Sequence, residues 1–368
     1  MKIAHLTSTF SAFSGIDRVV EQQAKELSEQ GNKVTIFALE ADLKPPRNAE
    51  LQVIGMPKSL FWQRIYRLFF PLDFVKALKW VPKLENYDII YSHQYPMNWL
   101  AYLAKKFYSV KYIYYDYGIA PPWTFSNFIE RTYIRMISFL ANWTIKRADG
   151  AISISQYLQQ QLKQKAGLVS EVVHPKIDTT RFHRGLDGSK IRDKYKLGAN
   201  PIVLYVGRIS PHKGVHLLIQ AFNLVKREIP NAKLLIVGKH TFAGYSKKLR
   251  QMADDSVIFA GYVADEEIPY CYAACAIYAT ASLWEGFDLP LAEAQACGKP
   301  VVAFNIGPHP EVVIDSETGF LVVRENIIAL SQAMIKVLKD NKLRQEMGAN
   351  AYKAVRGGFL GDDIVSRL

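Results

Sequence analysis

Short apolar runs alternate with longer amphipathic segments in the first half of the chain, a pattern typical of parallel strands separated by helices. Gly15 begins a predicted helix that runs to about Gln30, after a loop of small residues over 8–14. Ser155 is the expected N-cap of a later helix. The predicted strands of this half are residues 3–6, 33–39, 88–93, 111–115 and 150–155. A parallel sheet covered by helices is therefore expected.

A second series with the same alternation begins after Lys196. Its predicted strands are residues 201–207, 232–238, 256–259, 276–279 and 300–303. A strand and a hinge over residues 171–178 separate the two series, and the length of 368 residues suits two domains. The sequence thus predicts an α/β protein with two doubly wound, Rossmann-like parallel-sheet domains that face a central cleft. In such sheets ligands bind at the C-terminal ends of the strands.

The most informative segment, residues 282–298, is typical of a tight loop followed by a helix. Pro290 suits the first helical position, and Leu289 precedes a proline, so we expect the helix to begin at Pro290. Glu285 then lies on the loop and Glu293 about one turn inside the helix. The helix N-terminus between these carboxylates favours an anion. Two carboxylates flanking an anion site fit a ligand with hydroxyl groups at both ends and phosphate in the middle, which is a nucleotide diphosphate sugar.

Two cations lie near the start of the second series, because Arg208 follows the first strand and Lys213 precedes the next helix. Converging cations would neutralise the charge that develops on a departing diphosphate. The alternatives are a solvated basic loop for this pair and an exposed helix glutamate for Glu293. The spacing of Glu293 from Glu285 favours the binding interpretation.

Composition narrows the choice of partner. The chain has 46 basic and 34 acidic residues and a net charge of +12, which favours a phosphorylated ligand or an anionic membrane surface. Nucleic acid is not favoured, because the sequence shows no helix-turn-helix, zinc finger or RNA-binding signature.

The sequence also predicts a location. No apolar run reaches about 18 residues, and the N-terminus is typical of a strand and not of a signal peptide, so a cytoplasmic location is expected. The cysteines are expected to be buried and reduced, without zinc: Cys271, Cys275 and Cys297.

The chain resembles the family 4 retaining glycosyltransferases, which have the GT-B fold, in the order and spacing of its motifs. The matching motifs are Gly207-Arg208, Lys213-Gly214, Glu285-Gly286-Phe287, Leu289-Pro290, Glu293-Ala294, Gly298-Lys299-Pro300-Val301-Val302 and Gly307-Pro308-His309-Pro310-Glu311. The resemblance covers almost the whole chain. It implies an acceptor-binding domain over residues 1–178, a donor-binding domain over 179–350, and a C-terminal helix over 351–368 that packs back toward the first domain.

The resemblance also implies roles for single residues. Arg208 and Lys213 would hold the donor phosphates, Glu293 the ribose hydroxyls, and Glu285 the transferred sugar or its phosphate linkage. Asp288 stands where the family usually has glycine and would lie near the donor sugar. The remaining implied donor contacts are Gly15 at the phosphate, Gly261 at the base, and the backbone amides of Phe287, Asp288 and Leu289 around the sugar.

His93 and Asp116 follow consecutive predicted strands of the first domain, where an acceptor would bind. Many family members have a histidine near the position of Asp116. An aspartate could bind an acceptor hydroxyl or act as a base, and binding is favoured because an aspartate of ordinary pKa is a weak base. The resemblance implies attack on the same face of an oxocarbenium-like centre, assisted by the leaving phosphate and without a metal cofactor. Uridine diphosphate sugars are the expected donors because they are common in the family.

Two segments, residues 59–83 and 123–147, combine many aromatic residues with lysines and arginines. That mixture suits the surface of an anionic bilayer. It is equally typical of core-facing helices with a solvated basic face. A membrane role would make the enzyme peripheral on the inner face of the membrane and its acceptor a lipid-linked saccharide.

The sequence therefore predicts a retaining, metal-independent hexosyltransferase of polysaccharide or glycoconjugate synthesis. Two other functions fit the same donor motifs. A GT-B-fold sugar-nucleotide epimerase would convert the donor without an acceptor, and a non-catalytic scaffold subunit would bind it without turnover.

Overall fold

The chain forms two compact units in the computed structural model, which describes residues 1–11, 15–125, 127–240 and 243–359. Within these residues the first unit comprises 1–122 and 127–174, and the second comprises 123–125 and 175–359. The division falls between His174 and Pro175, where the sequence analysis placed it after residue 178. The helix expected over 351–368 overlaps the end of α14 (Asn341–Ala354) and the turn η6 (Val355–Phe359), and its last residues lie outside the described part.

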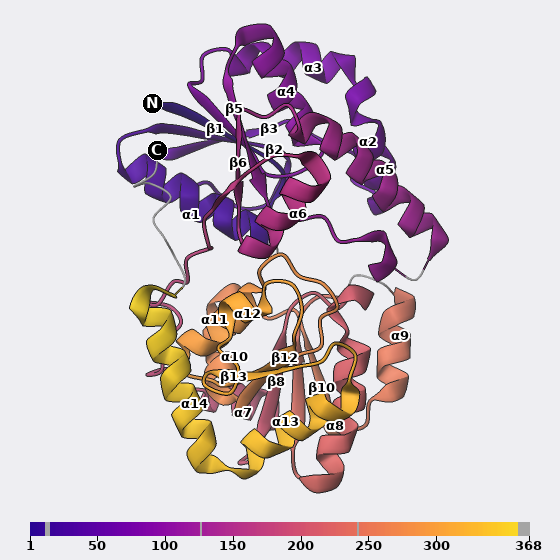
Figure 1. Ribbon diagram of the computed structural model, residues 1–368, viewed down its shortest axis with the longest axis vertical. Coiled ribbons are helices and arrows are strands. Elements are labelled where there is room, and N and C mark those ends of the chain that lie inside the picture. The colour runs from indigo at the N-terminus through magenta and orange to yellow at the C-terminus, as the bar shows by residue number, and fades with distance from the viewer. Residues whose placement is uncertain (12–14, 126, 241–242, 360–368) are drawn as a thin grey trace. The chain divides into compact units, whose positions relative to one another are not determined.

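The first unit contains a seven-stranded parallel sheet in the order β3-β2-β1-β4-β5-β6-β7 (Figure 1). Its strands are β1 (Lys2–Phe10), β2 (Lys33–Ala41), β3 (Ala49–Val53), β4 (Ile89–Ser92), β5 (Lys111–Asp116), β6 (Gly150–Ser153) and β7 (Glu171–Val172). Its helices are α1 (Gly15–Glu29), α2 (Leu60–Phe69), α3 (Phe74–Trp80), α4 (Met97–Tyr108), α5 (Phe128–Ile145) and α6 (Gln156–Ala166). Alternate residues of β1, Ala4 and Leu6, pack in one core with Leu100 of α4 because successive strand residues point to opposite faces.

The second unit contains a six-stranded sheet in the order β10-β9-β8-β11-β12-β13. Its strands are β8 (Ile202–Val206), β9 (Lys233–Val237), β10 (Val257–Gly261), β11 (Ile277–Thr280), β12 (Val301–Phe304) and β13 (Gly319–Val322). Its helices are α7 (Ser189–Lys194), α8 (Val215–Glu228), α9 (Ala243–Met252), α10 (Ile268–Ala274), α11 (Leu289–Ala296), α12 (His309–Val312), α13 (Ile327–Lys339) and α14. The apolar faces of α8 and α13 join β8, β9, β11 and β12 in one core. All of these strands pair in parallel, as expected for a doubly wound sheet.

Both sheets reverse their strand order at one point, between β1 and β4 in the first unit and between β8 and β11 in the second. Loops diverge there at the C-terminal ends of the strands, which makes these positions the expected ligand sites of such sheets. Arg208 and Lys213 follow β8, and Glu285 follows β11. The predicted fold class is confirmed, and the topology brings the donor motifs to the point of reversal in the second unit.

Several local predictions were wrong. β3 and β13 were not predicted. β3 is an edge strand with no buried residue, and only the first residue of β13 is buried, so neither has the continuous apolar core of the central strands. β1 extends to Phe10, where the sequence suggested a loop from residue 8, since Thr and Phe are well suited to a strand.

Ser155 caps α6, as predicted, and its hydroxyl accepts a hydrogen bond of 3.1 Å from the amide of Leu158. The three cysteines are buried and unpaired, as predicted.

None of the described helices is long and apolar enough to cross a bilayer.

We expect Gly214→Ala to destabilise the second unit strongly. Gly214 has a left-handed backbone (φ 61°), and a Cβ there would lie 1.8 Å from the carbonyl oxygen of Ala281. Relief requires movement of the backbone, so the loss in unfolding free energy should be about 3 kcal/mol or more. Chemical denaturation measures it. The matched control is Gly244→Ala in α9, where a Cβ would meet nothing within 4 Å; equal stability of the two variants would contradict the steric argument.

Candidate donor site and acceptor-side cluster

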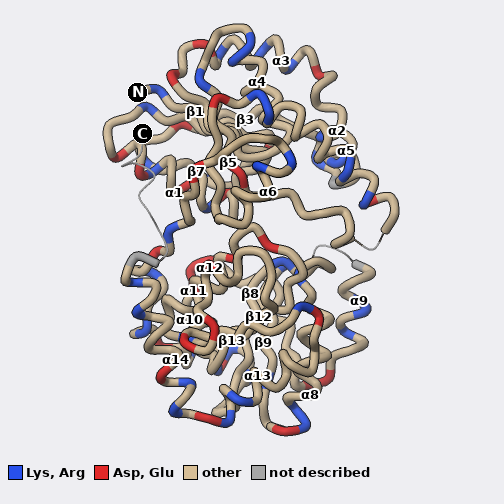
Figure 2. The backbone as a smooth tube through the Cα atoms, in the orientation of Figure 1, with Lys and Arg blue, Asp and Glu red and all other residues tan. Residues whose placement is uncertain are grey.

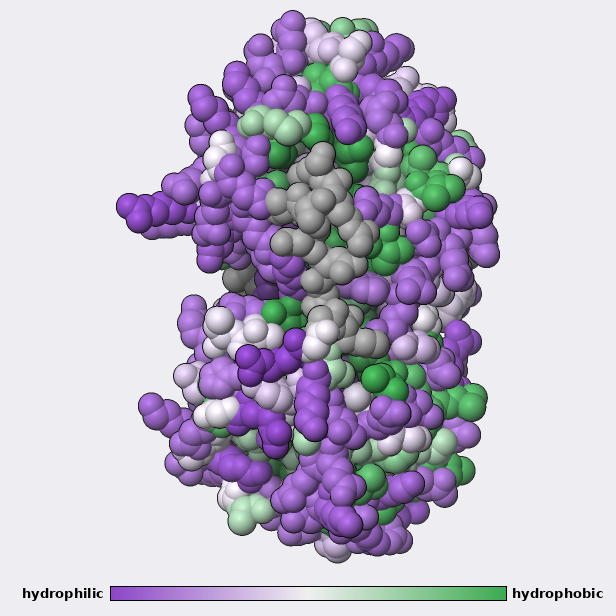
Figure 3. All heavy atoms as spheres, turned by 60° about the vertical axis from the view of Figure 1, so that its left-hand side comes forward, coloured by the Kyte–Doolittle hydropathy of each residue, from purple (hydrophilic) through white to green (hydrophobic). Residues whose placement is uncertain are grey.

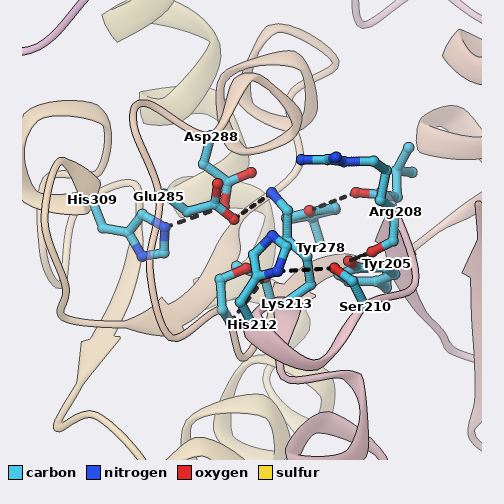
Figure 4. A network of polar contacts seen from close by, with 12 residues as sticks. Tyr205, Arg208, Ser210, His212, Lys213, Tyr278, Glu285, Asp288 and His309 are labelled. Atoms are coloured by element: carbon cyan, nitrogen blue, oxygen red, sulfur yellow. Dashed lines mark hydrogen bonds and ion pairs between the residues drawn. The ribbon is translucent and has the colours of Figure 1, made fainter. Parts of the chain in front are cut away.

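The loop after β8 places a lysine against the loop after β11. Lys213 ends a single 3₁₀ turn (Pro211–Lys213), and Gly214 then turns the chain into α8. The Lys213 Nζ lies 2.6 Å from the Oε1 of Glu285 (Figure 4). The two side chains are 16% and 7% exposed, so this is a largely buried ion pair. Removing one partner of such a pair leaves an uncompensated charge, at a cost of about 3–5 kcal/mol.

Glu285 lies in an environment that resists its ionisation. Burial raises the pKa of its carboxyl, and the negative charge of Asp288 raises that pKa further. The ion pair with Lys213 and a hydrogen bond from Ser282 act in the opposite direction. The charged form of Glu285 is therefore favoured by the nearby cation, Lys213. The two side chains lie together at the C-terminal end of the sheet.

α11 begins at Leu289, one residue before the predicted start. Leu289 precedes a proline, which disfavours a helical backbone. It is helical all the same, because the N-cap Asp288 has a left-handed backbone (φ 74°) that turns the chain directly into the helix. Pro290 still lies in the first turn, and Gly298 follows the helix with φ 68°, as predicted.

Glu293 is buried on α11, so the exposed-helix alternative is wrong. Its Oε2 accepts a hydrogen bond of 2.8 Å from the hydroxyl of Tyr272, which α10 contributes. Tyr272 is a residue that sequence reasoning missed, because an aromatic residue in an apolar helix gives no signal of a polar role. The hydroxyl fixes the orientation of the carboxylate.

Asp288 has a partner, His309, that the sequence analysis also missed. The Nε2 of His309, the first residue of α12, lies 3.2 Å from the Oδ2 of Asp288. The other ring nitrogen, Nδ1, lies 2.7 Å from the carbonyl oxygen of Phe304. Figure 4 shows the imidazole pointing from its own loop toward the carboxylates of the loop after β11.

The other residues of the donor motifs are distributed over several elements of the chain. Arg208 is exposed and lies beside the Lys213–Glu285 pair in Figure 4. Gly261 ends β10 with φ 69° and open space where a Cβ would lie, and the strand reaches two residues beyond its predicted end. Phe287 is buried in the second unit. Gly15, the first residue of α1, is exposed in the first unit.

Three buried rings of the first unit contact one another in a row: His5 on β1, His93 after β4 and Tyr117 after β5. His93 Nε2 lies 2.8 Å from the Nδ1 of His5, and His93 Nδ1 lies 3.0 Å from the hydroxyl of Tyr117. Burial lowers the pKa of His5 to about 3. Burial also holds the pKa of His93 well below its usual value, and the neighbouring His5 lowers it further. His93 is therefore a neutral hydrogen-bonding group.

Asp116 belongs to a different network from His93. Its Oδ1 accepts the amide of Gly118 at 2.9 Å, and its Oδ2 lies 3.5 Å from the hydroxyl of Ser153. Burial raises the pKa of Asp116 to about 6. The two residues end neighbouring strands, as predicted, but no hydrogen bond joins them among the described residues.

Asp17, in the first turn of α1, is a further buried carboxyl that the sequence analysis did not single out. Its Oδ2 accepts hydrogen bonds from the hydroxyl of Thr9 and from the amide of Ser11, both at 2.9 Å. Burial raises the pKa of Asp17 to about 6. The signal that could have found it is an acid directly after a loop of small residues at a strand end.

Within the described ranges, no three histidine, cysteine, aspartate or glutamate side chains gather closely enough to hold a metal ion.

Two family descriptions match the chain, one in each half. Glycosyltransferase Family 4 matches residues 13–181, and Glycosyl transferases group 1 matches residues 187–354. The chain is 32% identical over 216 residues to a GDP-mannose-dependent alpha-(1-6)-phosphatidylinositol monomannoside mannosyltransferase of Mycolicibacterium smegmatis, covering 55% of this chain and 56% of that protein. It is also 32% identical over 161 residues to O-antigen chain mannosyltransferase B of Escherichia coli, covering 42% and 41%. The chain thus spans about half the length of the curated relatives it matches.

Solved structures resemble the whole chain. Anabaena Alr3699/HepE, in complex with UDP and glucose, has a TM-score of 0.80 and 25% identity, covering 100% of this chain and 96% of that one. Sucrose-phosphate synthase from Thermosynechococcus elongatus has a TM-score of 0.84 at 21% identity, covering 98% and 95%, and supports the fold alone. With both halves matched and two doubly wound sheets in place, the chain belongs to the family 4 glycosyltransferases and has the GT-B fold.

Proposed function

We propose that this glycosyltransferase transfers a hexose from a nucleotide diphosphate sugar to a saccharide acceptor, with retention of anomeric configuration and without a metal ion. The observation that carries the proposal is the buried Lys213–Glu285 pair at the reversal point of the second sheet. An ammonium group has three N–H donors, so a lysine that contacts one carboxylate oxygen can also donate to phosphate oxygens. The product serves polysaccharide or glycoconjugate synthesis.

The donor is proposed to lie along the start of α11. Lys213 and Arg208 bind the diphosphate, and the positive end of α11 adds to their field. Glu293, oriented by Tyr272, accepts hydrogen bonds from the ribose hydroxyls. Gly261 leaves room for the base.

Glu285 and the backbone amides of Phe287, Asp288 and Leu289 contact the transferred sugar. We favour a UDP-sugar, since the relative similar over the whole chain was solved with UDP and glucose. The mannosyltransferase relatives make GDP-mannose the rival donor.

The mechanism depends on neutralising charge on the leaving diphosphate. As the glycosidic bond breaks, negative charge grows on the phosphate oxygen, where Lys213 is held rigidly by Glu285 in a region of low water content. The leaving phosphate then assists the acceptor hydroxyl, which attacks the same face of the oxocarbenium-like sugar. No covalent enzyme intermediate is required. The epimerase and the scaffold alternatives predict, respectively, a new sugar nucleotide without an acceptor and binding without turnover.

In the first unit we propose that Asp116 binds an acceptor hydroxyl and that His93 supports this region as a neutral hydrogen-bonding group. A carboxyl with a pKa near 6 is partly protonated near neutrality and can donate or accept. The catalytic base of the reaction is the departing phosphate, so neither residue needs to remove a proton.

The acceptor is proposed to be lipid-linked, because helices of the first unit expose apolar residues beside cations. α3 buries Trp80 in the core and exposes Phe74, Val75 and Leu78 on its other side. On α2 the polar Gln63 points inward, while Phe61, Trp62 and Phe69 are exposed. On α5, Phe128, Ile129, Met136 and Phe139 are exposed.

The same helices, and the turn after α3, carry exposed cations: Arg64, Lys79, Lys83, Arg131 and Arg135. Figure 2 shows lysine and arginine positions in blue along this part of the first unit. The face shown in Figure 3 differs, because hydrophobic residues form only small separate patches there. Aromatic and aliphatic side chains beside lysine and arginine suit the boundary of an anionic bilayer. Of the predicted segment 123–147, residues 123–125 belong to the second unit, so the proposed membrane contact there is limited to α5.

Substitution of the two glutamates should separate binding from turnover. Glu293→Gln should weaken nucleotide affinity about tenfold or more, because it removes a charged acceptor for the ribose. Glu285→Gln should leave that affinity nearly unchanged and lower kcat by about 100-fold. Calorimetric titration with UDP and GDP in EDTA, together with sugar-transfer kinetics, measures both effects. Glu317→Gln, an exposed glutamate of the same unit, is the control, and small, equal effects of the first two changes would contradict the donor site.

Asp116→Asn should change how stability depends on pH. The pKa of the folded carboxyl, about 6, lies above its ordinary value of 3.8. The folded chain therefore binds this proton more tightly, and the stabilisation it gives below pH 4 is lost as the pH rises through 6. Between pH 5 and 7.5 the parent should lose about 1–2 kcal/mol relative to the variant. Urea denaturation at both pH values measures this, and Asp17 titrates equally in both proteins; parallel pH profiles would show that Asp116 does not titrate there.

Vesicle binding tests the membrane proposal. The double change Phe74→Ser/Leu78→Ser should weaken sedimentation with phosphatidylglycerol vesicles by about tenfold or more, since each apolar side chain contributes about 1.5–3 kcal/mol when fully buried. Val169→Ser, at a position 68% exposed on the same unit, is the control. Neutral phosphatidylcholine vesicles should bind the parent weakly. Unchanged binding of the double variant, or equal binding to both lipids, would overturn this surface.

A further inference from the structure

Asp288 occupies a backbone position that favours glycine. Its φ of 74° lies in the left-handed region, which costs a residue with a Cβ about 1 kcal/mol or more. The side chain does not repay this by capping α11, because it accepts no hydrogen bond from the helix amides. The carboxylate must therefore have another role.

The two ring nitrogens of His309 each face an oxygen atom. A carbonyl oxygen only accepts, so the 2.7 Å contact with Phe304 requires a proton on Nδ1 of His309. A neutral imidazole would then turn the lone pair of Nε2 toward the Oδ2 of Asp288, 3.2 Å away. A hydrogen on Nε2 or on the carboxyl makes this contact a hydrogen bond that ties Asp288 to His309.

The contact with His309 explains how a second acid can lie beside Glu285. His309 is fully buried and Asp288 is 7% exposed, and burial of an uncompensated carboxylate in such surroundings would be costly. Among the described residues, Asp288 has its recorded hydrogen bond at Oδ2, which leaves Oδ1 as an acceptor. An oxygen of this kind repels phosphate and attracts a hydroxyl group.

We propose that Asp288, held by His309, binds a hydroxyl group of the transferred sugar and determines which nucleotide sugar the enzyme uses. The inference rests on the proposed donor site. The proposed contact of the Asp288 side chain is with the sugar and not with the nucleotide. A site that hydrogen-bonds a substrate hydroxyl discriminates strongly against analogues that lack it, because the buried partner is left unpaired.

The test compares Asp288→Gly with the parent in calorimetric titrations of the full chain. The probes are UDP and GDP, then UDP-glucose, UDP-galactose and GDP-mannose, then monodeoxy analogues of the sugar that binds most tightly. In the parent, removal of one hydroxyl should weaken binding at least about tenfold, or about 1.4 kcal/mol. In Asp288→Gly that penalty should disappear, while the affinity for the bare nucleoside diphosphate stays within about twofold. Glycine suits the backbone at this position, so the loop conformation is preserved.

Two changes at His309 provide a matched pair. His309→Gln can place an amide donor at the position of Nε2 and should keep the discrimination. His309→Asn can replace only the donor toward Phe304, so this variant should lose the discrimination. If Asp288→Gly does not fold, Asp288→Asn serves with the same criteria.

The outcomes separate the two proposals. Tight nucleotide binding with the same hydroxyl penalties in the parent and in Asp288→Gly would overturn this inference and leave the donor site intact. Failure of every nucleotide and nucleotide sugar to bind the parent would overturn both. Loss of nucleoside diphosphate affinity in Asp288→Gly, in step with the loss for sugars, would show that Asp288 supports the whole loop and does not select the sugar.

Discussion

The second unit is organised around one buried ion pair, that of Lys213 with Glu285. Its two residues come from loops that are 72 positions apart and meet only because β8 and β11 are neighbours at the reversal of strand order. The ammonium group favours the charged form of the carboxylate, against the effect of burial, and the carboxylate fixes the position of the ammonium group. Asp288 lies close enough to Glu285 to raise its pKa, and His309 contacts Asp288. Loss of the charge on Glu285 would therefore change the electrostatic environment of Asp288 as well.

The two units use buried polar groups in different ways. The second unit places opposite charges in contact, which suits a ligand that brings its own charge. The first unit contains neutral imidazoles, one of them hydrogen-bonded to Tyr117, and a separate carboxyl, Asp116, whose pKa is raised by burial beside the hydroxyl of Ser153. Groups that are neutral or easily neutralised suit an uncharged saccharide, whose hydroxyls both donate and accept.

Much of this arrangement could be predicted from the sequence, and the rest depends on contacts between distant residues. The apolar runs identified nearly all the central strands, and Pro290 and Gly298 identified the helix that follows the loop of Glu285. The start of α11 was misplaced by one residue because the turn is set by the backbone of Asp288, which its residue type does not predict. β3 was missed because an edge strand need not be apolar. The partnerships of Tyr272 with Glu293 and of His309 with Asp288 join residues 21 positions apart, and no local pattern reports them.

The close approach of Gly214 to the carbonyl of Ala281 has a consequence for how this family can diversify. The backbone carrying Lys213 and the backbone leading to Glu285 touch without a side chain between them, so neither loop can be lengthened, shortened or exchanged independently of the other. Grafting one loop from a relative would import a backbone path fitted to a different neighbour. New donor preferences are therefore reached more easily by exchanging side chains on a fixed frame than by rebuilding the loops, and libraries for altered specificity should leave both backbone paths intact.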